Sequence, residues 1–283
     1  MKTTDHHPAE RQITFYKFDG AGNDFVLIDT RNDVLQLTSE QIARICHRRF
    51  GVGADGLMTL GLADGYDFEM RYYNSDGRLA SMCGNGGRCI TAFARMLGVT
   101  PQQDGTYHFM GHDGVHEAEI LMWDDGAGFG LVRLGMRDVP SASIRRIKED
   151  SDGDLLQLDG WFLDTGSPHF VQRVDDLEHF DVFERGRRIR RMEQYFPQGT
   201  NVDFIEDMPD GSLFVRTYER GVEDETWACG TGVTACAIVS GNSRVRMRGG
   251  DFKVTFDTDG DTFTNVRLTG PVSYNFSGTW NMQ

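Results

Sequence analysis

Polar and apolar residues alternate over short runs along most of the chain, which is the period of half-buried β-strands. In the last forty or so residues this alternation continues almost without interruption, apart from the Gly270-Pro271 break. We therefore expect a protein dominated by strands. The runs predict strands at residues 13–18, 25–29, 57–60, 68–73, 106–110, 115–122, 130–136, 160–163, 170–174, 202–206 and 213–219.

Longer apolar spacings predict helices at residues 39–49, 87–97 and 177–191, and a fourth that ends near residue 239. Two of them follow similar turns, Cys83-Gly84-Asn85-Gly86 and Cys229-Gly230-Thr231-Gly232. Free backbone N–H groups and the helix dipole at such a start favour an anion, and they favour a thiolate over a thiol. Each turn is thus a candidate site for acid–base chemistry.

The two cysteine turns belong to a weak internal repeat. Cys83 precedes Cys229 by 146 residues, Phe50 precedes Phe196 by 146, and Phe25 precedes Phe170 by 145. Nearly equal separations predict two similar halves related by a pseudo-twofold axis, with both turns at the cleft between them. Residues 124–128 are the candidate linker. We expect a first lobe at 1–128, a second at 129–271, and a C-terminal strand at 272–283 that packs back on the first.

Composition and charge exclude several classes of partner. The 283 residues are 39% hydrophobic and 25% charged, which is typical of a globular protein, and no apolar run approaches transmembrane length. The net charge of −14 argues against nucleic acid or an anionic membrane as the main partner. Residues 1–12 are polar and lack the apolar core of a signal peptide, so we expect a cytoplasmic protein.

The cysteine pattern favours catalysis over structure. Five cysteines in such a chain argue against a disulfide framework, and their spacing does not fit a structural zinc site. Cys46, Cys89 and Cys236 lie in apolar helical stretches and are expected to be buried hydrophobic residues. Cys83 and Cys229 differ because each directly precedes a helix start.

One glycine motif is misleading. Gly51, Gly53 and Gly56 have the spacing of a dinucleotide fingerprint, but a predicted helix precedes them and a predicted strand follows. The fingerprint requires the order strand, turn, helix. A phosphate-binding loop is also missing, because no Gly-Lys-Ser or Gly-Lys-Thr sequence follows a glycine turn.

The ordered motifs resemble those of the diaminopimelate epimerase family, over nearly the whole chain. They are residues 18–25 (FDGAGNDF), 49–56 (RFGVGADG), 74–77 (NSDG) with 82–89 (MCGNGGRC), 196–201 (FPQGTN), and 218–221 (YERG) with 229–232 (CGTG). The resemblance implies an α+β fold of two pseudo-symmetric lobes, each a curved mixed sheet around a central helix. It also implies a homodimer that needs no cofactor or metal and that interconverts LL- and meso-2,6-diaminopimelate.

The resemblance also implies roles for individual residues. Cys83 and Cys229 match the pair that exchanges the α-proton, and His169 matches a histidine near the thiols. Glu219 and Arg220 match residues that hold the distal amine and carboxylate of the diamino dicarboxylate substrate. The other positions that match substrate-binding residues are Asn23, Asn74, Gly84, Asn85, Ser167, Asn201, Gly230 and Thr231.

Several alternatives stay open. Asn23 and Asn201 have a competing interpretation as residues that stabilise their own turns. Ser167 stands where the family often has asparagine, and residues 222–226 carry one residue more than the commoner family spacing. A related racemase or epimerase acting on proline or hydroxyproline is the alternative enzyme, although Glu219 and Arg220 argue against a monocarboxylate. An amino-acid-binding protein on the same fold is the alternative that is not an enzyme.

Overall fold

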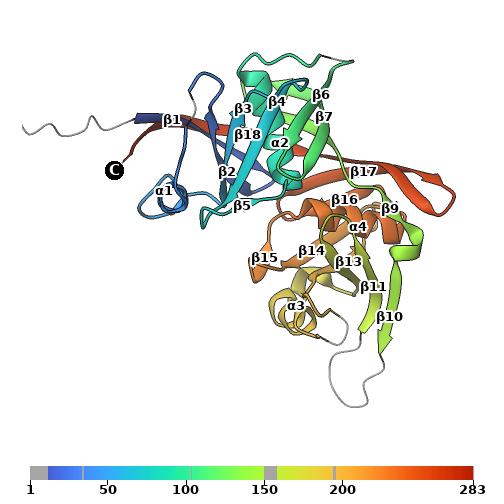
Figure 1. Cartoon of the computed structure of the whole chain (residues 1–283). Coiled ribbons are helices and arrows are strands. Elements are labelled where there is room, and N and C mark those ends of the chain that lie inside the picture. Colours follow the sequence, from blue (N-terminus) through green and yellow to red (C-terminus); the bar gives the residue numbers. More distant parts are fainter. Residues whose placement is uncertain (1–11, 34, 103, 150–157, 194–195, 283) are drawn as a thin grey trace, which may run out of the picture.

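The computed structural model describes residues 12–33, 35–102, 104–149, 158–193 and 196–282. The chain forms two lobes, and in each a sheet curves around one central helix (Figure 1). This arrangement confirms the predicted α+β fold of two similar lobes. None of the described helices is both long enough and apolar enough to cross a membrane.

Apart from the elements of the second lobe up to residue 149 and one 3₁₀ turn at Leu177–His179, the elements follow one another in the same order in both lobes. The first lobe contains β1 (Gln12–Gly20), β2 (Asn23–Asp29), α1 (Ser39–Cys46), β3 (Gly56–Gly61), β4 (Phe68–Asn74), β5 (Leu79–Ala80), α2 (Gly84–Met96), β6 (Thr106–Gly111), β7 (Gly114–Asp124) and β8 (Phe129–Gly135). The second contains β9 (Val139–Pro140), η1 (Ser141–Ser143), β10 (Arg145–Glu149), β11 (Leu158–Asp164), β12 (Pro168–Arg173), η2 (Leu177–His179), α3 (Val182–Arg190), β13 (Asn201–Asp207), β14 (Leu213–Glu219), β15 (Asp224–Thr226), α4 (Gly230–Ser240), β16 (Arg244–Met247) and β17 (Gly250–Asp259).

The pairing of strands repeats between the lobes. In the first lobe β1 to β4 and then β6 to β8 pair in sequence, and only the β2–β3 and β4–β6 pairs are parallel. In the second lobe β11 to β14 and then β16 to β18 pair in sequence, with β12–β13 and β14–β16 parallel. The repeated pattern confirms the two similar halves predicted from the cysteine and phenylalanine spacings.

The last strand, β18 (Thr262–Asn281), belongs to both lobes. Its first part pairs with β17 of the second lobe, and its later part pairs with β8 and β1 of the first. Because β18 lies between β8 and β1, it closes the first sheet into a ring around α2 (Figure 1). After closure, the short strand β5, which pairs only with β4, is the one edge strand of that sheet among the described residues. Strand β18 also ties the two lobes together through continuous backbone.

The two central helices form the cores of their lobes. On α2, Ile90 and Phe93 are fully buried against Phe18, Phe25 and other apolar side chains of the surrounding strands. On α4, the whole segment from Val233 to Ile238 is buried, and all of it except Thr234 belongs to a separate apolar cluster. A helix that is apolar on all sides is expected only where a sheet surrounds it.

Each central helix begins at the residue directly after its cysteine. Helix α2 begins at Gly84 rather than Gly87, and α4 begins at Gly230. Cys83 and Cys229 are the N-cap residues, with extended backbones and no side-chain capping bond. The glycines predicted as a turn therefore form the first helical turn, and their N–H groups remain available at the helix start.

Two other helices also differ from the prediction. The N-cap of α1 is Thr38 rather than Ser39, because Thr38 and Gln41 form a reciprocal capping box. The helix predicted at 177–191 is interrupted. The 3₁₀ turn η2 ends at His179, and the Asp181 side chain then caps α3 by accepting from the Glu184 N–H.

The predicted linker at residues 124–128 is wrong. Asp124 pairs with Phe129 across β7 and β8, so these residues form a hairpin turn within the first lobe. The Asp124 carboxylate stabilises the turn by accepting from two backbone N–H groups. Met136 instead packs on the cores of both lobes. We therefore propose a lobe boundary near Met136 in place of residue 128.

Replacement of Phe93 by alanine tests the role of α2 as the first core. Phe93 is fully buried and its ring contacts those of Tyr16 and Phe18. We expect Phe93→Ala to lower the free energy of unfolding by about 3–5 kcal/mol, measured by urea denaturation. Leu121→Ala, at a position that is 43% exposed, is the control and should change it by less than about 0.5 kcal/mol. Equal losses in both variants would contradict this description of the core.

Candidate active site

The starts of α2 and α4 meet at two glycines. A Cβ atom added to Gly84 would lie 3.5 Å from the Gly230 Cα, and one added to Gly230 would lie 3.1 Å from Leu268 and 3.4 Å from the Gly84 Cα. The two helix N-termini therefore lie next to each other, with space for about one Cβ atom between the two Cα atoms. Cys83 and Cys229, one residue before each glycine, are brought to the same place.

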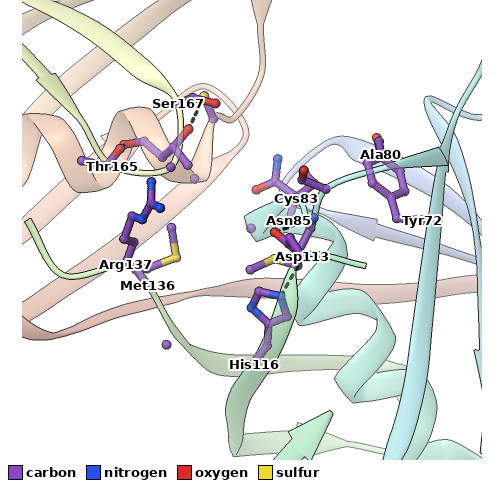
Figure 2. A pocket seen from close by; sticks show the side chains of 18 of the residues that line it. Tyr72, Ala80, Cys83, Asn85, Asp113, His116, Met136, Arg137, Thr165 and Ser167 are labelled. Atoms are coloured by element: carbon purple, nitrogen blue, oxygen red, sulfur yellow. Dashed lines mark hydrogen bonds and ion pairs between the residues drawn. The ribbon is translucent and has the colours of Figure 1, made fainter. Parts of the chain in front are cut away.

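A cleft of about 880 Å³ opens beside this contact. Figure 2 shows Cys83 and Asn85 on one side of it and Thr165 and Ser167 on the other. The predicted site residues that line the cleft are Asn23, Asn74, Cys83, Gly84, Asn85, Ser167, Glu219, Arg220, Cys229, Gly230 and Thr231. The other two, His169 and Asn201, are buried and do not contribute to its lining.

Amide side chains surround Cys83. Its Sγ donates to Asn23 Oδ1 at 3.8 Å, and Asn85 Nδ2 donates to the same oxygen at 3.1 Å. Asn85 also donates to the Ala228 carbonyl at 3.0 Å, which joins the two lobes beside the thiols. Asn23 Nδ2 donates to Asp55 at 2.7 Å. Asn23 therefore has a structural role in addition to facing the cleft.

A histidine and a carboxylate lie behind Cys229. Its Sγ lies 3.5 Å from Thr231 Oγ1, which is 2.9 Å from His169 Nε2. His169 Nδ1 is 2.7 Å from Asp203 Oδ2, and both of these side chains are fully buried. Sequence reasoning missed Asp203, because a lone aspartate inside a predicted strand carries no motif.

The side chain of Asn201 holds Arg220 in place at another wall of the cleft. Asn201 Oδ1 accepts from the Arg220 backbone N–H at 2.8 Å, and Arg220 Nη1 donates to the Gln198 carbonyl at 3.1 Å. Among the described residues no carboxylate pairs with the Arg220 guanidinium. Glu219 pairs with Asp224 across β14 and β15, so the residues between them form the turn that joins these strands. The turn accommodates the extra residue of 222–226, and Arg220 still lines the cleft.

The cleft has further lining residues that the sequence analysis did not identify. Tyr72 lies two positions before Asn74 on β4, so strand alternation places both side chains on one face and could have indicated it. Thr165 Oγ1 donates to the Thr231 carbonyl at 2.9 Å. Met136 and Arg137 also line the cleft, from the segment between β8 and β9 (Figure 2).

Burial dominates the electrostatics of both thiols. It raises the pKa of Cys83, and the backbone N–H groups of Gly86 and Asn85 oppose this rise. Burial and the Glu219 carboxylate raise the pKa of Cys229 still further, against a hydrogen bond from Thr231. The helix starts thus lower each thiol pKa as expected, but burial outweighs them, so the net lowering that we expected is wrong. Burial also raises the pKa of the Glu219 carboxyl.

A buried cation lies beneath the start of α2. Arg88 is fully buried and donates to the carbonyls of Gly84 and Pro271 and to Asn85 Oδ1. Its guanidinium also lies over the Phe252 ring, 5.3 Å from the centroid. Its positive charge lowers the pKa of Cys83, against the larger effect of burial. The site therefore combines helix N-termini and a fixed cation, an arrangement that attracts a carboxylate.

Solved structures with similar folds include amino-acid isomerases. A PhzF-family phenazine biosynthesis protein from Bacillus anthracis superposes with a TM-score of 0.71 at 15% identity, covering 96% of this chain and 100% of its own. A hydroxyproline epimerase from Agrobacterium vitis superposes with a TM-score of 0.67 at 14% identity, covering 97% and 94%. At these identities the likeness shows the two-lobe fold alone.

Sequence comparison gives the family. The diaminopimelate epimerase profile matches residues 15–122 and 161–274. A diaminopimelate epimerase of Flavobacterium psychrophilum is 40% identical over 94% of this chain and 100% of its own length. That of Chlorobaculum tepidum is 40% identical over 92% and 98%. The matched segments contain both cysteine turns and the strands around them, and the chain belongs to the diaminopimelate epimerase family.

Proposed function

We propose that this protein interconverts LL- and meso-2,6-diaminopimelate with Cys83 and Cys229 as its acid–base pair. The observation that carries the proposal is the meeting of two helix starts at one cleft, each with a cysteine as its N-cap. Inversion of a carbon requires removal of a proton from one face and return of a proton to the other. Two thiols on opposed helices suit this task without exchanging places.

The reaction begins with one thiolate and one thiol. The thiolate takes the α-proton, negative charge develops on the carbon and its carboxylate, and the opposite thiol donates its proton to the other face. The first cysteine then holds a proton and the second is a thiolate. Free N–H groups at the starts of α2 and α4 stabilise the carboxylate and the charge that grows on it, in a site with little water.

The charged groups of the cleft match a diamino dicarboxylate. Glu219 lines the cleft next to Arg220, and its carboxylate can hold the distal ammonium group of the substrate. Arg220 lines the cleft without a carboxylate partner among the described residues and can bind a second carboxylate in two parallel hydrogen bonds. A proline-type substrate has no second carboxylate, so these residues favour diaminopimelate.

The proposal includes a homodimer in the cytoplasm. The homodimer is expected from the resemblance to the family and the cytoplasmic location from the sequence, and the proposed substrate is a small molecule that needs no membrane or nucleic-acid partner. The net charge of −14 supports the exclusion of anionic polymers.

Cysteine replacement tests the two-thiol mechanism. We expect Cys83→Ser and Cys229→Ser each to lower kcat by about 10²–10⁴-fold, because a serine hydroxyl is far too weak an acid to exchange protons with an α-carbon. Turnover is measured by release of tritium or deuterium from the α-position. Cys46→Ala, at a buried position outside the cleft, is the control and should retain turnover. Near-normal turnover in either serine variant would refute the mechanism.

The pH dependence follows from the raised thiol pKa values. A raised pKa favours the protonated form, so little thiolate is present at neutral pH and its fraction grows about tenfold per pH unit below that pKa. We therefore expect kcat/KM to rise steeply between pH 6 and pH 8. A profile that is already flat over this range would show that the resting thiolate has a low pKa.

Arginine replacement tests the distal end of the substrate. Loss of one charge-assisted hydrogen-bonding group costs about 1.5–3 kcal/mol, so Arg220→Met should lower kcat/KM for diaminopimelate by about 10–150-fold. The loss should fall mainly on KM, because Arg220 binds the end of the substrate that does not react. Arg95→Met removes an exposed arginine paired with Asp125 and is the matched control. An unchanged KM in Arg220→Met would contradict the assignment.

A further inference from the structure

The turn that joins β14 to β15 carries a charged residue to which the proposed function gives no role. Glu219 ends β14, Arg220 follows it, and the chain enters β15 at Asp224. Between the two strands lies Glu223, whose backbone is left-handed with a φ of 60°. A residue other than glycine keeps this conformation only where surrounding interactions favour it. The contacts of Glu223 therefore indicate what the turn requires.

Four hydrogen bonds hold Glu223 in the turn. Its backbone N–H donates to the Glu219 carbonyl at 2.8 Å, and its Oε1 accepts from the Gly221 N–H at 3.2 Å. Oε1 also accepts from Arg190 Nε at 2.8 Å, and Oε2 accepts from the Tyr218 hydroxyl at 3.3 Å. Burial raises the pKa of the Glu223 carboxyl, but the Gly221 N–H and Arg190 outweigh it and lower that pKa below its ordinary value. Glu223 is thus an anion at neutral pH.

Helix α3 brings Arg190 to this turn. The helix packs beside β14 and β15 (Figure 1). A Cβ atom added to Gly186 would lie 2.7 Å from Tyr218 Cγ, so the helix approaches the strand this closely only because residue 186 is glycine. Arg190 is four positions after Gly186 and lies on the same face of α3. Packing of the helix therefore fixes where the Arg190 side chain meets Glu223.

Arg190 and Arg220 approach the same glycine. A Cβ atom added to Gly199 would lie 3.0 Å from Arg190 Cζ and 3.4 Å from Arg220 Cδ. Arg220 Nη1 donates to the carbonyl of the preceding residue, Gln198, at 3.1 Å. Glu223 is only three residues after Arg220 in the turn, so its flexible side chain has two cations within reach. It pairs with Arg190.

Two carboxylates are close to Arg220 in the sequence, and each is bound to another residue. Glu219 Oε2 accepts from Thr226 Oγ1 at 3.0 Å, and Glu223 is bound by Arg190. Among the described residues no carboxylate pairs with the Arg220 guanidinium, whose hydrogen bond is to a backbone carbonyl. A guanidinium in this state can bind a substrate carboxylate without first losing an ion pair, which reduces the cost of binding.

We propose that Arg190 is a positioning residue for substrate binding, which holds Glu223 away from Arg220 and so keeps the Arg220 guanidinium free for a substrate carboxylate. The proposal rests on the proposed function for the identity of that substrate, a diamino dicarboxylate. Without Arg190, Glu223 pairs with Arg220, and the substrate has to displace it. Such competition raises KM and leaves kcat unchanged, because the reacting end of the substrate is not affected.

Paired replacements distinguish this role from a purely structural one. A partly exposed ion pair changes an equilibrium by up to about fivefold, so Arg190→Met should raise KM for diaminopimelate about three- to fivefold and keep kcat within about twofold. The double variant Arg190→Met/Glu223→Gln lacks the competing carboxylate, and its KM should return to within about 1.5-fold of the unmodified protein. If Arg190 only stabilised the fold, the second replacement would not lower KM.

Two single variants complete the comparison. Glu223→Gln removes the carboxylate but keeps an oxygen that accepts from Gly221, so KM should stay within about 1.5-fold of the unmodified value. Arg187→Met removes an exposed arginine of the same helix, and KM should likewise stay unchanged. The proposal is overturned by an unchanged KM in Arg190→Met, by a raised KM in Glu223→Gln, or by a double variant whose KM is as high as that of Arg190→Met.

A measurement without substrate separates this proposal from the proposed function. Phenylglyoxal modifies arginine side chains, and a guanidinium paired with a carboxylate reacts more slowly because the pair stabilises its charged form. Modification of Arg220, followed by mass spectrometry of its peptide, should slow about three- to fivefold in Arg190→Met and recover in the double variant. An unmodified protein that does not epimerise diaminopimelate would refute the proposed function alone. An unchanged Arg220 rate in Arg190→Met would refute the role of Arg190.

Discussion

The close contact between Gly84 and Gly230 is the constraint on which the site depends. Two helix N-termini repel each other electrostatically, because each carries a partial positive charge. They are held together here by the two sheets that surround them and by β18, which runs through both lobes. The contact brings together the N–H groups of two helix starts, an arrangement that favours an anion.

Burial and the helix starts act in opposite directions on the thiols. Burial raises both pKa values, whereas the N–H groups after each cysteine lower them. A dry cleft is nevertheless useful, because fixed dipoles stabilise a growing carbanion more strongly where water is excluded. The same burial that raises the pKa of each thiol also makes its thiolate a stronger base.

The pseudo-symmetry of the fold does not extend to the groups behind the cysteines. On the first side, Asn23 and the buried cation Arg88 face Cys83; on the second, a titratable histidine faces Thr231 and through it Cys229. In a reaction in which two thiols exchange protonation states at every turnover, the surroundings of each cysteine must accommodate both its thiol and its thiolate form. In the proposed mechanism, the two lobes would meet this requirement with different groups.

The sequence by itself determined the local chemistry of this protein. Alternating apolar residues predicted most strands, and the glycines after Cys83 and Cys229 indicated two helix starts. These signals are readable from the sequence because they depend only on neighbours along the chain. Only the tertiary structure decided how β18 closes the first sheet, that residues 124–128 form a hairpin, and that Asp203 reaches His169. Those contacts join residues distant in sequence, so no local pattern specifies them. The direction of the thiol pKa shifts was decided in the same way, since burial is a property of the folded chain.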